Sequence, residues 1–534
     1  MSKWTVRTRG LALAAAGLLC LGAVALPAGA ATPETLVDLV RAGQREAVLA
    51  AITSPDIDLE AKEPDGSTVL LWATYKVDQG LVRALLKAGA KANVTNRYGA
   101  SPLSEAVKLG DLDLVRLLLD AGADANSPNQ DNQTALMLAA SVGSLDIAQL
   151  LIQHGADVRA VEQFRGQNAL MWAAAGNQPE IVDLLIARGA DVTMRAKDDD
   201  WPRQMTSEPR AQFRQTGGLT ALLYATRSGC YRCAVALVKA GADVNRPNPD
   251  GVTPLINALD NRNFDVAMFL LDQGANPASW DMTGRTPLYV AVDMNSFRPG
   301  GGGGFGGPAA PRPPNKATAM DLVNRLLDAG VDPNHELTRM RPNGNGRGRF
   351  ADYMMRGGTG PLLVATLSLD DVAIKTLLAR GAEVDLPNVF RITPLMAAVG
   401  MSGSGRAGGG VQQGDMQARA LKVVDLLLDA GANINARVTD SHTHTAKFVA
   451  YVQGRDHEGQ TALFAAAESG WDKVVKHLLD RGADPAVRDA AGKTALDFAR
   501  TPLPTGPGAP AAPTAAATAT RAATVALLEA VKAR

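Results

Sequence analysis

The chain has 534 residues, its 54 basic and 54 acidic side chains give a formal net charge of zero, and it contains only three cysteines. Without an excess of positive charge it lacks the electrostatic footprint of a nucleic-acid-binding protein. With so few cysteines it is not a scaffold built on disulfides. We therefore expect the packing of apolar side chains to stabilise the fold, and no cofactor is expected.

The N-terminal segment has the features of an export signal. Three basic residues precede an apolar run over 11–26, and Ala28 and Ala30 form the small-x-small pattern that a signal peptidase reads. The run is shorter than the roughly 20 residues that a spanning helix needs. These features predict a cleaved signal peptide over 1–30, with an uncleaved anchor as the alternative. We expect the mature chain to be periplasmic or secreted and to have no transmembrane segment.

A short motif recurs along the rest of the chain, as in ITPLMAAV from Ile392. Its Thr or Ser position, or the residue aligned with it, falls at 68, 101, 134, 168, 220, 253, 286, 360, 393, 461 and 494. Most of these steps are 33 or 34 residues long. A second marker, a glycine usually within A-G-A-D or R-G-A-D, follows 21 residues later in eight of the eleven units. A fixed period of this kind predicts a solenoid of repeated units.

Each unit has the start and stop signals of two short helices. A Thr or Ser hydroxyl before Pro or Ala caps a free backbone N–H at the first helix. In the second unit, Leu114, Val115, Leu118 and Leu119 lie on one stripe of a second helix, and Gly122 supplies the left-handed residue that ends it. One such helix pair cannot bury its stripe alone, so neighbouring pairs must stack.

The two markers and their period resemble the ankyrin repeat, and the resemblance covers nearly all of the mature chain. It implies an all-α solenoid of stacked helix pairs with projecting β-turn or hairpin fingers. It also implies that the first helices and the turns line a concave side where partner proteins bind. The chain departs from the family at the position directly after T-P-L, where histidine is common and this sequence has none. We expect apolar packing to replace the hydrogen bonding made there.

The resemblance divides the chain into an N-terminal capping helix pair over 31–62 and about eleven repeats. Ten of the predicted repeats span 63–95, 96–128, 129–162, 163–214, 215–247, 248–280, 281–354, 355–387, 388–455 and 456–488. The last repeat spans 489–534 and is interrupted by a Pro- and Ala-rich linker over 501–520.

Five interruptions of the period fall at two positions within the unit. Three turns between units are longer by nearly the same amount, near 195–216, 336–357 and 437–457, and we expect them to project from one side. Two Gly- and Pro-rich insertions, near 295–316 and 400–416, separate the two helices of a unit and are predicted to be disordered loops.

Aromatic residues are few, so their placement favours some positions as contacts for a partner. Trp72, Trp172 and Tyr224 occupy the same place in their first helices, where another unit has Glu105. A position that accepts both Trp and Glu is not expected to be deep core. Ordinary packing between repeats is the alternative reading. The predicted partner-binding residues are Trp72, Tyr75, Tyr98, Trp172, Trp201, Tyr224, Trp280, Tyr289, Arg347, Arg349, Phe350 and Tyr353.

The second enlarged turn concentrates arginines around Phe350 and Tyr353. It is a candidate contact for an acidic partner or an anionic surface, and a solvated basic loop is the alternative.

Cys230 and Cys233 form a C-x-x-C motif. At a helix N-terminus such a pair can be a redox centre. The alignment of the repeats instead places Cys233 on the buried stripe, which favours a small disulfide or two unpaired thiols.

The third enlarged turn contains His442 and His444, followed by Asp456 and His457. These residues are a conceivable metal site if the turn is a hairpin, but no helical H-E-x-x-H spacing supports one. A solvated or partner-facing hairpin is the favoured reading, and no metal is expected.

No catalytic motif emerges from the sequence, so we do not expect an enzyme. The sequence predicts a monomeric protein-interaction scaffold in the cell envelope that binds a protein and no nucleic acid. The alternatives are a secreted effector that binds a host protein, and an enzyme that depends on the His-rich turn or on the C-x-x-C thiols.

Overall fold

The computed structural model describes 35–198, 217–296, 315–338, 358–401, 413–439, 457–501 and 515–532. These residues hold twenty-four α-helices and, outside three isolated β-bridges, no extended pairing. None of the helices in these ranges has the length and apolar character needed to cross a bilayer. The chain divides into two compact units, Met1–Lys91 and Ala92–Arg534.

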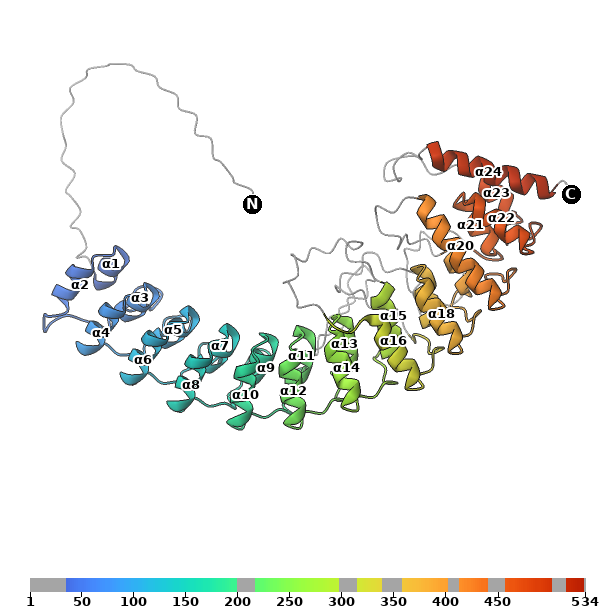
Figure 1. Ribbon diagram of the computed structural model, residues 1–534. Helices are drawn as coiled ribbons and strands as arrows, with labels where there is room; N and C mark the ends of the chain where they lie inside the picture. The colour runs from blue at the N-terminus through green and yellow to red at the C-terminus, as the bar shows by residue number, and fades with distance from the viewer. Residues whose placement is uncertain are drawn as a thin grey trace, which may run out of the picture. The chain divides into compact units, whose positions relative to one another are not determined.

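The first unit contains two helix pairs (Figure 1). They are α1 (Leu36–Arg41) with α2 (Arg45–Ala51), and α3 (Val69–Tyr75) with α4 (Gln79–Lys87). Helix α1 packs on α3 and α2 packs on α4. The predicted capping segment 31–62 thus contains α1 and α2.

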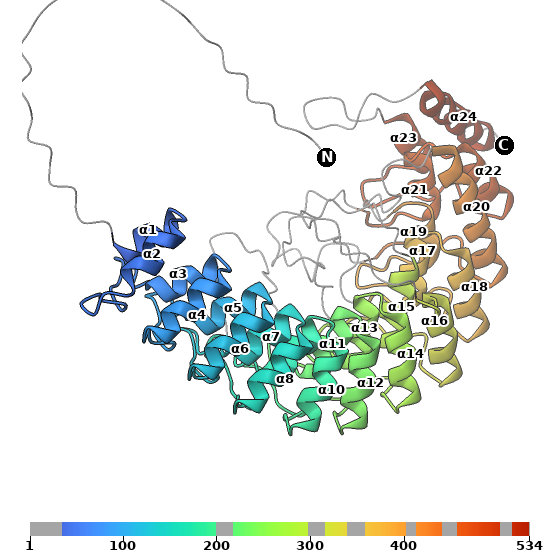
Figure 2. The same cartoon turned by 60° about the vertical axis from the view of Figure 1, so that its left-hand side comes forward.

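The second unit repeats the same arrangement, with first helices in one row and second helices in another (Figures 1 and 2). The first helices are α5 (Pro102–Leu109), α7 (Ala135–Val142), α9 (Ala169–Ala175), α11 (Ala221–Ser228), α13 (Pro254–Asp260), α15 (Pro287–Ser296), α17 (Pro361–Leu367), α19 (Pro394–Ala398), α21 (Ala462–Glu468) and α23 (Ala495–Arg500). The second helices are α6 (Leu112–Asp120), α8 (Leu145–Gln153), α10 (Pro179–Ala187), α12 (Tyr231–Lys239), α14 (Phe264–Asp272), α16 (Ala319–Asp328), α18 (Asp371–Ala379), α20 (Gln413–Asp429), α22 (Asp472–Asp480) and α24 (Ala515–Lys532). Each helix packs on its row neighbours, and the first-helix row lies on the inner side of the bend of this unit (Figure 2).

The motif residue begins the first helix in the way the sequence predicts. In α7 the hydroxyl of Thr134 accepts from the amide of Met137 at 3.4 Å. In α5, Ser101 accepts from the amide of Ser104, and Ser104 in turn accepts from the amide of Ser101, which satisfies two N-terminal amides at once. Gly360 occupies the aligned position before α17 and has no side chain that could accept a hydrogen bond, so α17 begins without a side-chain cap.

A turn residue two positions before each cap has left-handed backbone geometry, including where it is not glycine. Gly99 has φ +73°, and a Cβ there would lie 2.5 Å from the amide nitrogen of Gln130 in the next turn. Asn132 and Arg391 occupy the same place with φ of 62° and 59°. Because this region favours glycine, the fold imposes the geometry on both residues.

Apolar stripes and side-chain amides hold successive repeats together. Leu114, Val115 and Leu118 on α6 are fully buried, as the stripe predicts. At the ends of the second helices, Asn126 donates to the carbonyl of Gly155 at 2.8 Å and accepts from the amide of Asp157 at 2.7 Å. Equivalent contacts recur between later repeats, so each unit satisfies backbone groups of the next.

Each of the three enlarged turns begins and ends on a short hairpin base of its own. Gly218, Gly358 and Gly459 donate their amides to the carbonyls of residues 197, 337 and 438, respectively. The base is anchored by a buried apolar side chain in each case, at Ala196, Leu337 and Val438. The three insertions therefore leave the second unit from equivalent positions along one edge.

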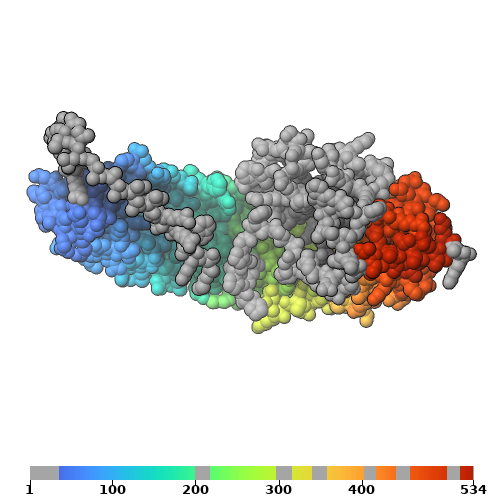
Figure 3. Space-filling view, turned by 90° about the horizontal axis from the view of Figure 1, so that it is seen from above, coloured from blue at the N-terminus to red at the C-terminus, as the bar shows by residue number. Residues whose placement is uncertain are grey.

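The C-terminal helix α24 closes the end of the second unit (Figure 3, red). It begins at Ala515, inside the predicted linker 501–520, so the boundary predicted for that linker is wrong. The segment AAATAT is rich in alanine, the strongest helix former. Arg521 fastens this helix by donating to the carbonyls of Ala499 and Glu468, each at 3.0 Å, and so satisfies groups at the ends of α23 and α21.

Candidate functional site

The first-helix row contains Trp72, Trp172 and Tyr224, whose environments differ. Trp72 and Trp172 are half-buried, so each presents part of its ring to solvent. Tyr224 is only 6% exposed. Tyr289 is 1% exposed and lies directly after T-P-L, where its amide donates to the capping hydroxyl of Thr286. The prediction that Tyr224 and Tyr289 contact a partner with their rings is therefore wrong, because packing between repeats covers both.

Trp72 belongs to a complete polar cluster in the first unit. Its indole N–H donates to Glu63 at 2.7 Å, and Arg41 donates to the other oxygen of the same carboxylate at 2.8 Å. The guanidinium of Arg41 lies over the Trp72 ring, 5.2 Å from its centroid. The exposed ring of Tyr75 meets Trp72 edge-on. One carboxylate thus joins an indole and a guanidinium on this face.

Tyr224 belongs to a second polar cluster, formed with Gln167 and Arg227, which we call the α9–α11 cluster. Its hydroxyl accepts from the side-chain amide of Gln167, and Arg227 lies over its ring at 4.9 Å. Burial, the largest cause, raises the pKa of the Tyr224 phenol, while Gln167, Arg227 and Arg165 act to lower it. The phenol is therefore neutral at physiological pH.

The most exposed aromatic residues of the second unit lie on the turns between repeats. Tyr98 is 74% exposed, Phe164 71% and Trp280 62%. Trp280 stacks on His335 with 5.8 Å between ring centroids. Phe164 was not among the predicted contacts. The sequence does contain a signal for this contact. Phe164 lies two positions before Gly166, and that glycine marks the exposed turn between repeats.

The second-helix row is different, because several of its exposed cations pair with acids of the preceding repeat. Four such pairs join Asp272 to Arg325, Asp328 to Arg380, Asp371 to Lys422, and Asp429 to Arg481. Glu180 and Arg232 make a fifth pair, between α10 and α12. The acid comes from the earlier repeat and the base from the later one in every pair. Each exposed pair adds little stability.

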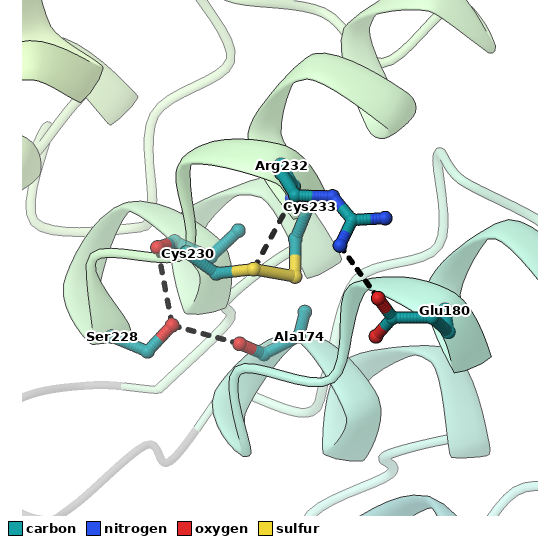
Figure 4. The surroundings of a disulfide bond; sticks show 7 residues. Ala174, Glu180, Ser228, Cys230, Arg232 and Cys233 are labelled. Carbon is teal, nitrogen blue, oxygen red and sulfur yellow. Dashed lines mark hydrogen bonds and ion pairs between the residues drawn. A yellow bond between two sulfur atoms is a disulfide. The ribbon is translucent and has the colours of Figure 1, made fainter. Parts of the chain in front are cut away.

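Cys230 and Cys233 form a disulfide at the start of α12 (Figure 4). Both side chains are buried, and Cys230 Sγ accepts from the amide of Cys233 at 3.1 Å. In other second helices an aspartate makes this cap, as Asp111 does in α6. Beside the disulfide, Ser228 donates to the carbonyl of Ala174 at 2.8 Å. This environment is that of a structural crosslink, because no thiol reagent can reach a sulfur without local opening.

The histidine-rich turn lies mostly outside the described residues, which include His457 but not His442, His444 or Asp456. The Nδ1 atom of His457 lies 2.8 Å from Oε1 of Gln460 at the hairpin base. Across the ranges that the structure describes, no cluster of His, Cys, Asp and Glu has the makings of a metal site. Trp201, Arg347, Arg349, Phe350 and Tyr353 also lie outside the described ranges.

Comparison with known proteins identifies the repeat. The family model of three-copy ankyrin repeats matches 36–129, 103–196 and 222–298, and the single ankyrin repeat model matches 391–438 and 458–490. Together these matches cover more than half of the chain.

Individual relatives match shorter segments. The chain is 26% identical over 215 residues to ankyrin repeat protein FPV014 of fowlpox virus, covering 40% of this chain and 36% of that protein. It is 34% identical over 93 residues to the mouse RelA-associated inhibitor, covering 17% of this chain and 11% of that protein. It is 33% identical over 81 residues to the mouse B-cell lymphoma 3 protein homolog, covering 15% and 18%.

The chain thus spans about a third or less of the length of these curated relatives. In both compact units, helix pairs and their caps fall where the ankyrin-repeat models match the sequence. The predicted all-α solenoid is confirmed, and the chain belongs to the ankyrin-repeat family.

Proposed function

We propose that this protein is a non-catalytic interaction scaffold of the cell envelope. It binds another protein through the first-helix row and the turns beside it. The observation that carries this proposal is the contrast between the two rows. The three most exposed aromatic residues of the second unit, Tyr98, Phe164 and Trp280, lie on the turn edge, while several charges of the second-helix row pair between repeats. Exposed aromatic residues are enriched at the centres of protein interfaces.

The envelope location rests on the sequence of the N-terminus and on the cysteine pair. A basic segment followed by a short apolar run and Ala28-x-Ala30 is typical of an exported precursor. A disulfide between Cys230 and Cys233 persists in an oxidising compartment and is rare in a reducing one. On this proposal the mature chain is a monomer of about eleven repeats with an N-terminal cap. Fractionation of the native cell tests the location, since recovery of the full precursor in the cytoplasm would contradict it.

A pull-down from periplasmic extract tests the binding face. We expect the mature chain to retain a partner, and Tyr98→Ala or Trp280→Ala to weaken that partner's binding by about 2 kcal/mol, as at an interface hot spot. Tyr231→Ala is the matched control, because Tyr231 is an exposed aromatic residue at the start of α12 in the second-helix row. Equal retention by all three variants would remove the turn edge from the proposed contact surface.

Trimming the three enlarged turns to ordinary length gives an independent test. Their hairpin bases allow each turn to be closed by two residues, for example between Val438 and Gly459, as Arg97 and Tyr98 lie between Asn96 and Gly99 in an ordinary repeat. Loss of the partner on trimming would assign the turns to the contact surface. Full retention would show that the first-helix row binds without them.

A further inference from the structure

We propose that Asp385 takes up a proton as the pH falls and donates it in a hydrogen bond to the carbonyl oxygen of Gly431, so that the junction between the turns after α18 and α20 responds to pH. The inference goes beyond the proposed function, because it concerns how one junction of the stack responds to its surroundings and needs no partner. It is carried by a comparison of Asp385 with the asparagines that occupy its place in other repeats.

The position four residues after the glycine that ends a second helix normally bridges two repeats. Five asparagines at this position donate a side-chain N–H to the carbonyl of the next such glycine at 2.8–3.3 Å. The side-chain oxygen of each accepts from the amide two residues beyond that glycine at 2.6–2.9 Å. The five are Asn93, Asn126, Asn245, Asn334 and Asn435. The asparagine amide thus matches one acceptor and one donor of the following turn.

Asp385 occupies this position after α18 and makes only one of the two bonds. Its Oδ2 accepts from the amide of Asn433 at 2.8 Å, and Asn433 lies two residues beyond Gly431. Because this bond orients the side chain as in the asparagines, Oδ1 takes the place of the amide nitrogen and faces the Gly431 carbonyl. Within the described part of the chain, this Oδ1 is buried and has no hydrogen-bond partner.

Protonation supplies the donor that is missing at this junction. A carboxylate oxygen and a carbonyl oxygen both accept hydrogen bonds, so the ionised form of Asp385 cannot bond to Gly431. A buried acceptor without a partner costs free energy. When Oδ1 carries a proton, its hydroxyl can donate to the carbonyl as the asparagine N–H does. The Asp385 side chain as a whole is partly exposed, which gives the proton a route from solvent.

The cations around this junction are bonded elsewhere. Arg380, at the end of α18, pairs with Asp328 of α16. Arg437, on the turn after α20, donates to the carbonyls of Gly459 and Arg488. Among the described residues, no cation therefore compensates the ionised form of Asp385. The other titratable groups on the turns after α16, α18 and α20 are Asp332, His335, Glu336 and Glu383.

A second carboxyl group on the neighbouring turn shows that this edge disfavours carboxylate charge. Burial, the largest cause, and the nearby Glu383 raise the pKa of Glu336, while Arg391 acts to lower it. Like charges and burial both favour the protonated form of an acid. The junction of Asp385 with Gly431 lies in the chain between the second and third enlarged turns. Acidification is therefore expected to tighten the part of the stack that separates those two turns.

Hydrogen exchange measured by mass spectrometry on the full mature chain tests the proposal. Wild type and Asp385→Asn are compared with each other at pH 7.5 and again at pH 4.5, so the chemical effect of pH on exchange cancels. At pH 7.5 we expect the amides of 430–435 to exchange about tenfold faster in wild type, because Asp385→Asn supplies the missing N–H at every pH. At pH 4.5 we expect the two proteins to exchange within about twofold of each other, since both then donate to Gly431.

Two further variants separate the proton from other effects of the side chain. Asp385→Ala has no carboxyl group, as at the equivalent Ala278 and Ala486, so its exchange relative to Asp385→Asn should be the same at both pH values. Asn435→Asp moves the arrangement to the next junction, opposite Gly482, and should give 481–486 the pH dependence that wild type shows at 430–435. A wild-type to Asp385→Asn ratio that does not change with pH would overturn the proposal. So would the same change with pH in Asp385→Ala, or no change in Asn435→Asp.

Discussion

The left-handed turn residue Arg391 offers a direct test of how the fold constrains the sequence. Arg391 has φ of 59°, at the turn position that glycine occupies in nine of the eleven units. A non-glycine residue in this geometry costs roughly 1–2 kcal/mol. Replacing it with glycine removes that cost but adds about 0.4–1 kcal/mol of backbone freedom to the unfolded chain. We therefore expect Arg391→Gly to stabilise the protein by about 0.5–1 kcal/mol.

Two further variants make the reasoning falsifiable. Asn132→Gly should change the free energy of unfolding by only a few tenths of a kcal/mol, because Asn tolerates left-handed geometry far better than Arg. Gly358→Ala should destabilise the fold by at least about 1 kcal/mol, since the added Cβ would lie 2.8 Å from the amide nitrogen of Val389 in the next turn.

Urea unfolding followed by circular dichroism measures the free energy of unfolding of all three variants under the same conditions. The order of stability should be Arg391→Gly, then wild type and Asn132→Gly, then Gly358→Ala. If Arg391→Gly is no more stable than Asn132→Gly, the backbone argument fails, and the side chain of Arg391 must make a compensating contribution.

Three other predictions concern the ends of the chain and the filled Trp72 cluster. Glu63→Gln weakens a charge-assisted acceptor of Trp72 and should destabilise the first unit by about 1–3 kcal/mol, which a shift of the urea midpoint followed by tryptophan fluorescence would reveal. Arg521→Met removes the donors that fasten α24, so limited proteolysis should release that helix while the rest of the chain remains intact. Backbone and side-chain hydrogen bonds from Thr494 hold the pKa of Asp497 below its usual value. The stabilisation from the Asp497 carboxylate is therefore present above about pH 4 and is lost as the pH falls through the lowered pKa. In urea unfolding at decreasing pH, an Asp497→Asn variant should lose less stability at the C-terminal end than the wild type.

Sequence periodicity predicted the helix pairs well because local rules decide where each one starts and ends. Thr134 caps its helix and the buried stripe of α6 follows the predicted spacing. The start of α24 was predicted less well. An alanine-rich segment that follows several prolines has the composition of a linker. Its helix packs against α22 and α23. Because the linker displaces this helix from the 33-residue period, the period does not predict where the helix begins.

The partner-binding residues were harder to predict because burial depends on the neighbouring repeat. Tyr289 and Trp172 look alike as aromatic residues near the start of a first helix, yet one is covered and the other is half-exposed. The burial of Tyr289 is set by the helices on either side of it.

The one-way order of the ion pairs on the second-helix row gives the stack a polarity. A cut between α16 and α18 would leave Asp328 unpaired on the N-terminal fragment and Arg380 unpaired on the C-terminal fragment. Two fragments separated at any of these five junctions therefore carry opposite, complementary charges at the new ends. At low ionic strength these charges should favour head-to-tail association of two complementary halves over association of two identical halves, by the small amount that one exposed ion pair contributes.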